Sequence, residues 1–237
     1  MNRQDPLPYF ERVKPGLVPI AGGQNEVCGT CRSGANPGYQ RCYRCKNENV
    51  VEVLPISMSV HGELLHDRLR WYKDGNEQQK QDYTLQLAAL LLLFLGRHLK
   101  CIGGNPDAVA TVSSEKRDAV KNIVDRTANF RGMHAPLART RSDNPPTFQA
   151  PDSLKDKKVL LLDDTFTTGR SITAAYRALS SVGAELLTPV VIGRHFRPGF
   201  ATSERLHTCL KNHEWRLDRC GICAPIMCDG RSQAQLL

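Results

Sequence analysis

The sequence lacks the apolar segments that membrane insertion or secretion would need. Its longest apolar run, residues 85–95, contains Gln86 and is much shorter than the roughly 20 residues of a membrane-spanning helix. Residues 1–19 carry charged side chains and four prolines without an apolar core, so they do not resemble a secretory signal. We therefore expect a cytoplasmic protein with no membrane partner.

The sequence also lacks the usual marks of a nucleic-acid-binding arm. It contains no long Lys/Arg block, no helix-turn-helix pattern and no basic stripe with interleaved aromatic residues. It has no Ser/His/Asp or Cys/His constellation that would supply a catalytic nucleophile. The formal net charge of +8 and the pI of about 9.1 nevertheless favour an anionic partner, without choosing between a phosphorylated small molecule and nucleic acid.

Cysteine is abundant, and the count of nine is odd. In a reducing cytoplasm this favours metal ligation over disulfides. Two Cys-x-x-Cys pairs, Cys28 with Cys31 and Cys42 with Cys45, have the spacing of a structural Zn²⁺ site. Redox pairs or unrelated thiols are the alternative.

A second cluster near the C-terminus predicts a second structural Zn²⁺. Its ligands would be Cys209, His213, Cys220 and Cys223. Cys228 could replace Cys209 or His213, and the cysteines of both ends could instead form a joint layer around two metals. Cys101 stands alone and is interpreted as a buried apolar residue.

The remaining pattern predicts an α/β fold with a mostly parallel sheet flanked by helices. Residues 50–58 form a strand that Pro55 confines to an edge, and residues 107–112 and 186–193 form further strands. Residues 62–72 and 83–99 form helices, the second one buried against the sheet. We divide the chain into an irregular arm (1–25), a zinc ribbon (26–50), the α/β domain (51–195) and a C-terminal Cys/His segment (196–237).

Residues 158–171 carry the clearest signal for function. A buried apolar strand at 159–162 ends on Asp163 and Asp164, and a hydroxyl-rich turn with Gly169 leads into a helix at 172–182. A helix N-terminus with nearby hydroxyl groups binds phosphate well. The alternative is an ordinary strand, turn and helix with a solvated acid pair.

This stretch resembles the binding motif of type I phosphoribosyltransferases. The resemblance implies that Asp163 and Asp164 are the catalytic acids and hold the ribose hydroxyls of phosphoribosyl pyrophosphate (PRPP). It also implies a loop around the 5′-phosphate, formed by Thr165, Thr167, Thr168, Gly169, Arg170 and Ser171. With the Cys-x-x-Cys pairs, the edge strand and the Leu-rich helices, the order of elements over residues 28–193 is similar to that of ComF-like phosphoribosyltransferases.

The same resemblance points to a pyrophosphate site after the strand at 107–112. Ser114, Lys116 and Arg117, with Ser113, offer hydroxyls and positive charge at a helix start. A serine helix cap with a solvated first turn is the alternative. Residues 131–151 are interpreted as a long loop in which Arg139 and Arg141 either close over pyrophosphate or belong to a solvated linker.

The resemblance implies an enzyme that binds PRPP with Mg²⁺ and displaces pyrophosphate with a nitrogen acceptor, such as a nucleobase. The alternative is a regulatory or DNA-uptake-associated protein that binds PRPP without robust transfer, with nucleic acid as its partner. The sequence names neither the acceptor nor the oligomeric state.

Overall fold

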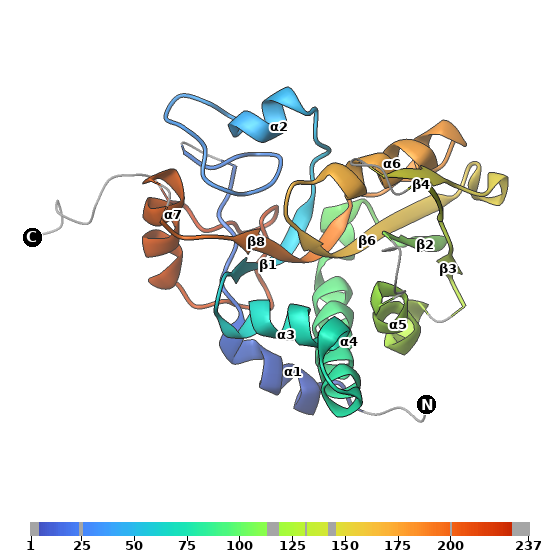
Figure 1. The fold of residues 1–237 in the computed structure, drawn as a ribbon, viewed down its shortest axis with the longest axis horizontal. Coiled ribbons are helices and arrows are strands. Elements are labelled where there is room, and N and C mark those ends of the chain that lie inside the picture. Colours follow the sequence, from blue (N-terminus) through green and yellow to red (C-terminus); the bar gives the residue numbers. More distant parts are fainter. Residues whose placement is uncertain are drawn as a thin grey trace, which may run out of the picture.

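The protein is an α/β fold in which a mostly parallel sheet is flanked by helices on both faces (Figure 1). This is a computed structural model, and it describes residues 5–23, 26–112, 119–130, 132–141, 146–199 and 201–228. The expected fold class is confirmed.

The central sheet is parallel throughout the strand pairs described here. Its order is β1-β8-β6-β2-β3, and β7 pairs with the start of β6. The strands are β1 (Leu54–Val60), β2 (Ala108–Thr111), β3 (His134–Ala135), β6 (Lys158–Phe166), β7 (Glu185–Leu186) and β8 (Val190–Phe196).

The apolar run of β6 is continuous because both faces of this strand are buried. Leu160 and Leu162 belong to the core on one face, while Val159 and Leu161 belong to the core on the other. Alternate side chains of a strand point to opposite faces, so a strand covered on both sides needs apolar residues at every position. The predicted strand at 159–162 lies in the first half of this longer strand.

Different helices cover the two faces. On the first face, core residues come from α1 (Leu7–Val13), α3 (Leu64–Asp74), α4 (Glu77–Ile102) and α5 (Ala119–Arg126). On the second, they come from α6 (Arg170–Ser181) and the cysteine-rich segment that contains α2 (Tyr43–Asn47). A third cluster joins the end of β1 to α7 (Ala201–Lys211).

The longest helix, α4, begins at a capping box, in which Asn76 and Gln79 each accept a hydrogen bond from the other's backbone N–H. It ends at Gly103, which adopts the left-handed conformation. Among the described residues, α4 alone is long and apolar enough to cross a membrane, and 56% of its most apolar 18-residue window is buried in the structure. It therefore packs as a core helix against the sheet, as the sequence predicted.

The N-terminal arm is more ordered than the sequence suggested. Instead of an irregular segment, the described part of residues 1–25 contains α1, a short 3-10 helix (Lys14–Gly16) and a bridge from Val18 to Met58 of β1. This isolated bridge and β8 are the partners of β1 in the described sheet, so Pro55 lies in an edge strand as expected. The arm folds because Phe10 and Val13 are buried in the main core.

The prediction of a long loop at 131–151 was also wrong. It contains β3 and an antiparallel pair, β4 (Ala138–Arg141) with β5 (Thr147–Gln149). Leu137 and Ala150, which flank the open end of this pair, are buried in the core on the α6 side. The strands are too short, and too close to proline residues, to produce a readable alternation in the sequence.

The packing of the arm can be tested by a pair of truncations on α1. Phe10 is 5% exposed and its ring lies 5.9 Å from the ring of Trp215, whereas Leu7 on the same helix is 51% exposed. Phe10→Ala should lower the free energy of unfolding by about 3 kcal/mol. Leu7→Ala should change it by less than about 0.5 kcal/mol. Equal effects in denaturant titrations would show that the arm is not part of the core.

Candidate functional site

A cavity of about 490 Å³ opens at the carboxyl edge of the sheet. The strand pairing explains its position. Thr111, the last residue of β2, pairs with Leu162, so β6 continues from Asp163 with β8 as its neighbour and without β2. Ligands of open α/β sheets bind in such a gap beyond the ends of the strands.

The two predicted acids line this cavity, and each has its own hydrogen-bond or ion-pair partners. Asp164 is buried, accepts a hydrogen bond from the hydroxyl of Tyr72 and forms an ion pair with Lys73. Asp163 accepts a hydrogen bond of 2.8 Å from the backbone N–H of Asp164. Both acids therefore line one cavity, and each is held by a different set of partners.

Burial and mutual repulsion set the protonation of this pair. Burial, and then the negative charge of Asp164, raise the pKa of Asp163 well above its usual range, while Lys73 opposes that shift. The same two causes raise the pKa of Tyr72, which keeps its hydroxyl protonated as a donor. A cation that entered between the carboxylates would relieve the repulsion.

Tyr72 and Lys73 are site residues that the sequence analysis missed. Both come from the last turn of α3, a segment that the sequence analysis described only as a helix. The hydrogen bond from Tyr72 to Asp164 joins residues 92 positions apart. No local pattern reports such a contact.

The predicted phosphate loop is divided between two environments. Thr165, Thr167 and Ser171 line the cavity together with the acids. Thr168 faces a second cavity of about 500 Å³, which also contacts the cysteine-rich segment. The loop leads directly into α6, whose first backbone N–H groups lack helical partners and suit an anion.

Gly169 gives the loop its tight turn. Its φ is +82°, and an added Cβ would lie 2.5 Å from side-chain atoms of both Phe166 and Val50. A side chain here would be strained by the backbone angle and would also collide with its neighbours. Glycine thus lets the loop pack closely against the chain that leaves the cysteine-rich segment.

The side chain of Arg170 makes a different contact from the one the sequence suggested. Its guanidinium forms two 2.9 Å hydrogen bonds with the carboxylate of Glu48, which lowers the pKa of Glu48. Thr173 on the same helix accepts a hydrogen bond from the backbone N–H of Val51. These contacts fix the start of α6 to the segment that follows α2.

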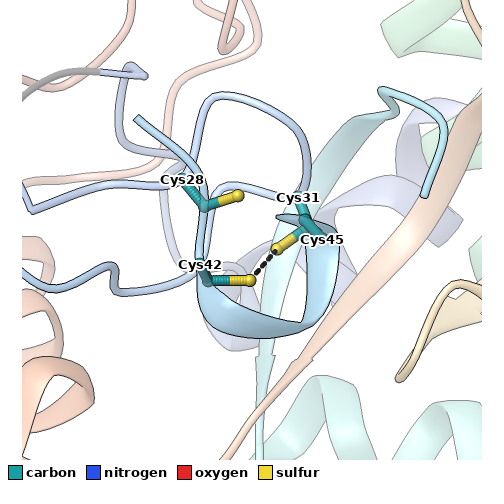
Figure 2. Close-up of side chains that lie close together, drawn as sticks. All are labelled: Cys28, Cys31, Cys42 and Cys45. Atoms are coloured by element: carbon teal, nitrogen blue, oxygen red, sulfur yellow. Dashed lines mark hydrogen bonds between the residues drawn. The ribbon is translucent and has the colours of Figure 1, made fainter. Parts of the chain in front are cut away.

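The four N-terminal cysteines come together as predicted (Figure 2). Their sulfur atoms all lie within 4.8 Å of one another, with 3.8 Å between those of Cys31 and Cys42. None of the four forms a disulfide, and four thiolates at these separations suit tetrahedral Zn²⁺. We call this group the ribbon cluster (Cys28, Cys31, Cys42 and Cys45).

Arg194 connects the ribbon cluster to the predicted phosphate loop. Its Nε donates to the carbonyl of Cys31 at 3.1 Å, and its Nη1 donates to the carbonyl of Phe166 at 3.1 Å. A second hydrogen bond from Nη1 reaches the carbonyl of Thr167 at 3.3 Å. One guanidinium therefore positions a cluster residue relative to the loop.

The expected pyrophosphate residues Ser114, Lys116 and Arg117 lie outside the described residues, as does Ser113. What the structure describes of that side of the cavity is Val112, Ala119, Val120 and Arg139, the last from β4. The side chain of Arg141 is also outside the described part. Arg139 is thus the one predicted basic residue that the structure places at the cavity.

The opposite side of the cavity carries histidines that the sequence analysis did not select. His66 of α3 and His195 of β8 line it beside Ser59, Leu69 and Arg70, and the two imidazole rings are 5.5 Å apart. Burial, followed by repulsion from His66 and Arg194, lowers the pKa of His195. The two histidines are 129 positions apart in the sequence, so no short motif contains both of them.

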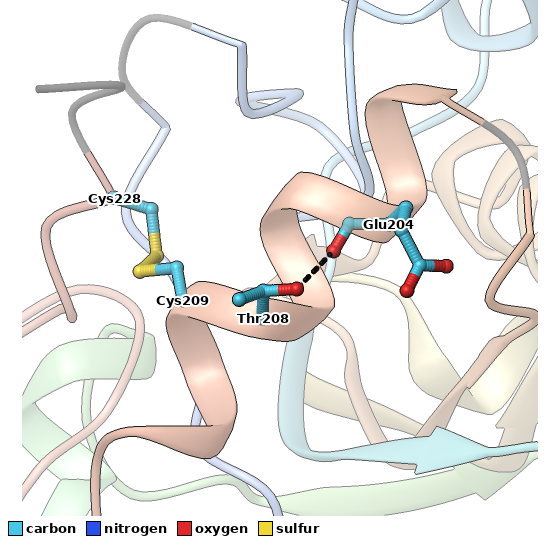
Figure 3. Close-up of a disulfide and its surroundings, with 4 residues drawn as sticks. All are labelled: Glu204, Thr208, Cys209 and Cys228. Atoms are coloured by element: carbon cyan, nitrogen blue, oxygen red, sulfur yellow. Dashed lines mark hydrogen bonds between the residues drawn. A yellow bond between two sulfur atoms is a disulfide. The ribbon is translucent and has the colours of Figure 1, made fainter. Parts of the chain in front are cut away.

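The predicted C-terminal metal site was right for Cys220 and Cys223 and wrong for Cys209 and His213. Cys209 forms a disulfide with Cys228, which removes both as thiolate ligands (Figure 3). His213 is not part of the group that surrounds Cys220 and Cys223. Two residues of α4 complete this group, which consists of His98, Cys101, Cys220 and Cys223. The interpretation of Cys101 as an isolated apolar residue was therefore also wrong.

No family model and no curated protein matches the sequence. Among solved structures, the chain is similar to a purine phosphoribosyltransferase from Pyrococcus horikoshii, with 19% identity over 49% of this chain and 74% of that one, at a TM-score of 0.34. A hypoxanthine phosphoribosyltransferase from Staphylococcus aureus gives 13% identity, 65% and 71% coverage, and a TM-score of 0.31. The UMP synthase of Leishmania donovani gives 18% identity, 53% and 26% coverage, and a TM-score of 0.30. Because these TM-scores are below 0.5, we assign no residue from them.

The negative charge of the acid pair should lower the free energy of unfolding. Asp163→Asn keeps an oxygen that can accept from the N–H of Asp164 but removes the repelled carboxylate. At neutral pH it should stabilise the protein by about 1 kcal/mol, or about 2–4 °C in Tm. The gain should shrink as the pH falls, because the raised pKa of Asp163 means that the wild-type carboxyl becomes protonated and loses its charge. A thermal unfolding series over pH that shows destabilisation at neutral pH would contradict this.

Proposed function

We propose that the protein is a phosphoribosyltransferase that binds PRPP and transfers its phosphoribosyl group to a nitrogen acceptor, with release of pyrophosphate. The observation that carries this proposal is the content of one cavity: an acid pair and Thr165 on β6, then Thr167 in the following loop and Ser171 in the first turn of α6. This set matches the order of groups on a phosphorylated ribose.

The donor would bind along the end of β6. Asp163 and Asp164 would accept hydrogen bonds from the ribose hydroxyls, and their negative charge would favour the positive charge that develops on the ribose during transfer. The loop hydroxyls and the backbone N–H groups of α6 would hold the 5′-phosphate. The 5′-phosphate lies away from the bond to pyrophosphate that breaks, so binding it would serve to position the ribose.

The acid pair also suits Mg²⁺. Carboxylate oxygens are hard ligands, and a cation beside the pair would offset the repulsion from Asp164 that helps to raise the pKa of Asp163. When bound, Mg²⁺ would neutralise charge on the pyrophosphate leaving group. We expect Asp163, which has the weaker protein contacts of the two acids, to face it.

Pyrophosphate would leave on the β2 side of the cavity. Arg139 lines that side, and the hydroxyls and charges of Ser114, Lys116 and Arg117 follow β2 in the sequence. Displacement at the anomeric carbon requires the acceptor and the leaving group on opposite sides of that carbon. The acceptor would therefore enter on the β8 side.

On the β8 side, His195 is the residue best suited to the acceptor nitrogen. Its lowered pKa keeps the imidazole neutral at pH 7, so it can accept a hydrogen bond or a proton from the attacking N–H. Arg70 makes the same side positively charged, and His66 adds a polar ring there. An acceptor that carries negative charge, such as an acidic heterocycle, would fit better than a neutral base.

The donor assignment can be tested by calorimetry and pyrophosphate release. The wild-type protein should bind PRPP with Mg²⁺, and Asp163→Ala should weaken binding by about 1.5–3 kcal/mol. Incubation with PRPP, Mg²⁺ and a panel of acidic and neutral nitrogen bases should release pyrophosphate with at least one acceptor. Absence of any heat with PRPP would contradict the proposal.

One observation favours a second function, a PRPP-binding regulatory protein of the ComF-like, DNA-associated kind. Tyr43 is 84% exposed and Tyr39 is 54% exposed, both on the cysteine-rich segment, and Lys46 lies over the ring of Tyr39. Exposed aromatic rings next to basic residues suit single-stranded nucleic acid. PRPP binding without release of pyrophosphate, together with salt-dependent DNA binding lost in Tyr43→Ala, would favour this function.

The acceptor side gives a prediction that is independent of donor binding. His195→Gln should lower kcat/KM for the acceptor about 100-fold, because the proton acceptor is lost. The Kd for PRPP should stay unchanged. His61→Gln is the matched control, since His61 is exposed and does not line the cavity. If His195→Gln instead weakened PRPP binding and left kcat/KM for the acceptor unchanged, His195 would belong to the donor side and the assignment of the two sides would be wrong.

A further inference from the structure

We infer that the C-terminal segment carries a second Zn²⁺ site, made by His98, Cys101, Cys220 and Cys223 (the core cluster). One ligand atom of each residue lies within 4.8 Å of the corresponding atoms of the other three. Two ligands come from adjacent turns of α4 and two from a Cys-x-x-Cys turn more than a hundred residues later. This inference does not rest on the proposed function.

The distances match a shared metal. The sulfur atoms of Cys220 and Cys223 are 3.4 Å apart, and Nδ1 of His98 is 3.7 Å from the sulfur of Cys223 and 3.8 Å from that of Cys101. Ligands that bind zinc at about 2.0–2.3 Å in a tetrahedron are separated by roughly this much. Three thiols and an imidazole form a soft set that selects Zn²⁺ over Mg²⁺ or Ca²⁺.

His98 is already oriented for ligation. Its ring is buried, and Nε2 lies 2.9 Å from the carbonyl oxygen of Leu217, an acceptor, so this nitrogen carries the proton. The tautomer leaves the lone pair of Nδ1 facing the three sulfurs. A metal-bound histidine usually fixes its other nitrogen in this way.

The Cys-x-x-Cys turn has the hydrogen bonds of a metal-binding turn. The sulfur of Cys220 accepts the backbone N–H groups of Ile222 and Cys223, both at 3.4 Å. Hydrogen bonds to sulfur favour the thiolate, which is the form that binds zinc. Cys220 is buried while Cys223 is exposed, so a metal can enter from the side of Cys223.

The site would fasten the C-terminal segment to the core. Trp215, five residues before Cys220, is buried and donates from Nε1 to the carbonyl of Ile56 in β1. Ile226, three residues after Cys223, pairs with the N-terminal arm at Ala21. Four protein ligands leave no open position, so the role is structural.

Elemental analysis of the full chain tests the site. Wild-type protein should contain two Zn²⁺ per chain, and Cys223→Ser should contain one. The control Cys209→Ser/Cys228→Ser should keep two, because the disulfide contributes no ligand. A Cys223→Ser chain with the wild-type zinc content, or a control that loses one zinc, would overturn the assignment.

A second measurement keeps the test decisive if Cys223→Ser does not fold. In the wild-type chain, Cys101, Cys220 and Cys223 should resist alkylation until a zinc chelator is added, as read by peptide mass mapping. Chelation should also change the fluorescence of buried Trp215. Alkylation of the exposed Cys223 at the same rate with and without chelator, or a Cys220–Cys223 disulfide in the peptide map, would overturn the site.

Discussion

The candidate site depends on keeping two carboxyl groups adjacent at the end of a buried strand. Burial in a region of low dielectric constant and like-charge repulsion both oppose this arrangement, as the raised pKa of Asp163 shows. The fold compensates with a hydroxyl donor from Tyr72 and a positive charge from Lys73, both aimed at Asp164. The end of α3 is therefore part of the site, although it was absent from the motif.

The predicted phosphate loop depends in turn on contacts with the cysteine-rich segment. Gly169 lets the loop approach Val50, Arg170 pairs with Glu48, and Arg194 spans from Cys31 to the loop carbonyls. These contacts come from different parts of the chain, but all connect the loop to one small unit. A structural metal in that unit would thus act on the site through positioning, since its four thiolates leave no place for substrate.

The sequence predicted what is encoded locally. The strand of β6, its acids, the following helix and the ribbon cluster are each contained in a short stretch, so spacing and apolarity were sufficient. The missed features join distant segments: Tyr72 to Asp164, His66 to His195, and α4 to the C-terminal turn. Cys209 and His213 were chosen as ligands because they are near Cys220 in sequence, whereas three-dimensional packing brought His98 and Cys101 instead.

The arrangement of the nine cysteines has a consequence for how the newly made chain folds. Each of the nine cysteines has a sulfur neighbour: four in the ribbon cluster, three in the core cluster and two in the Cys209–Cys228 disulfide. During synthesis, seven of these thiols must avoid oxidation while two become joined. Zinc bound in the two clusters would protect these seven thiolates from oxidants, so metal loading before disulfide formation would favour the pairing of Cys209 with Cys228 alone.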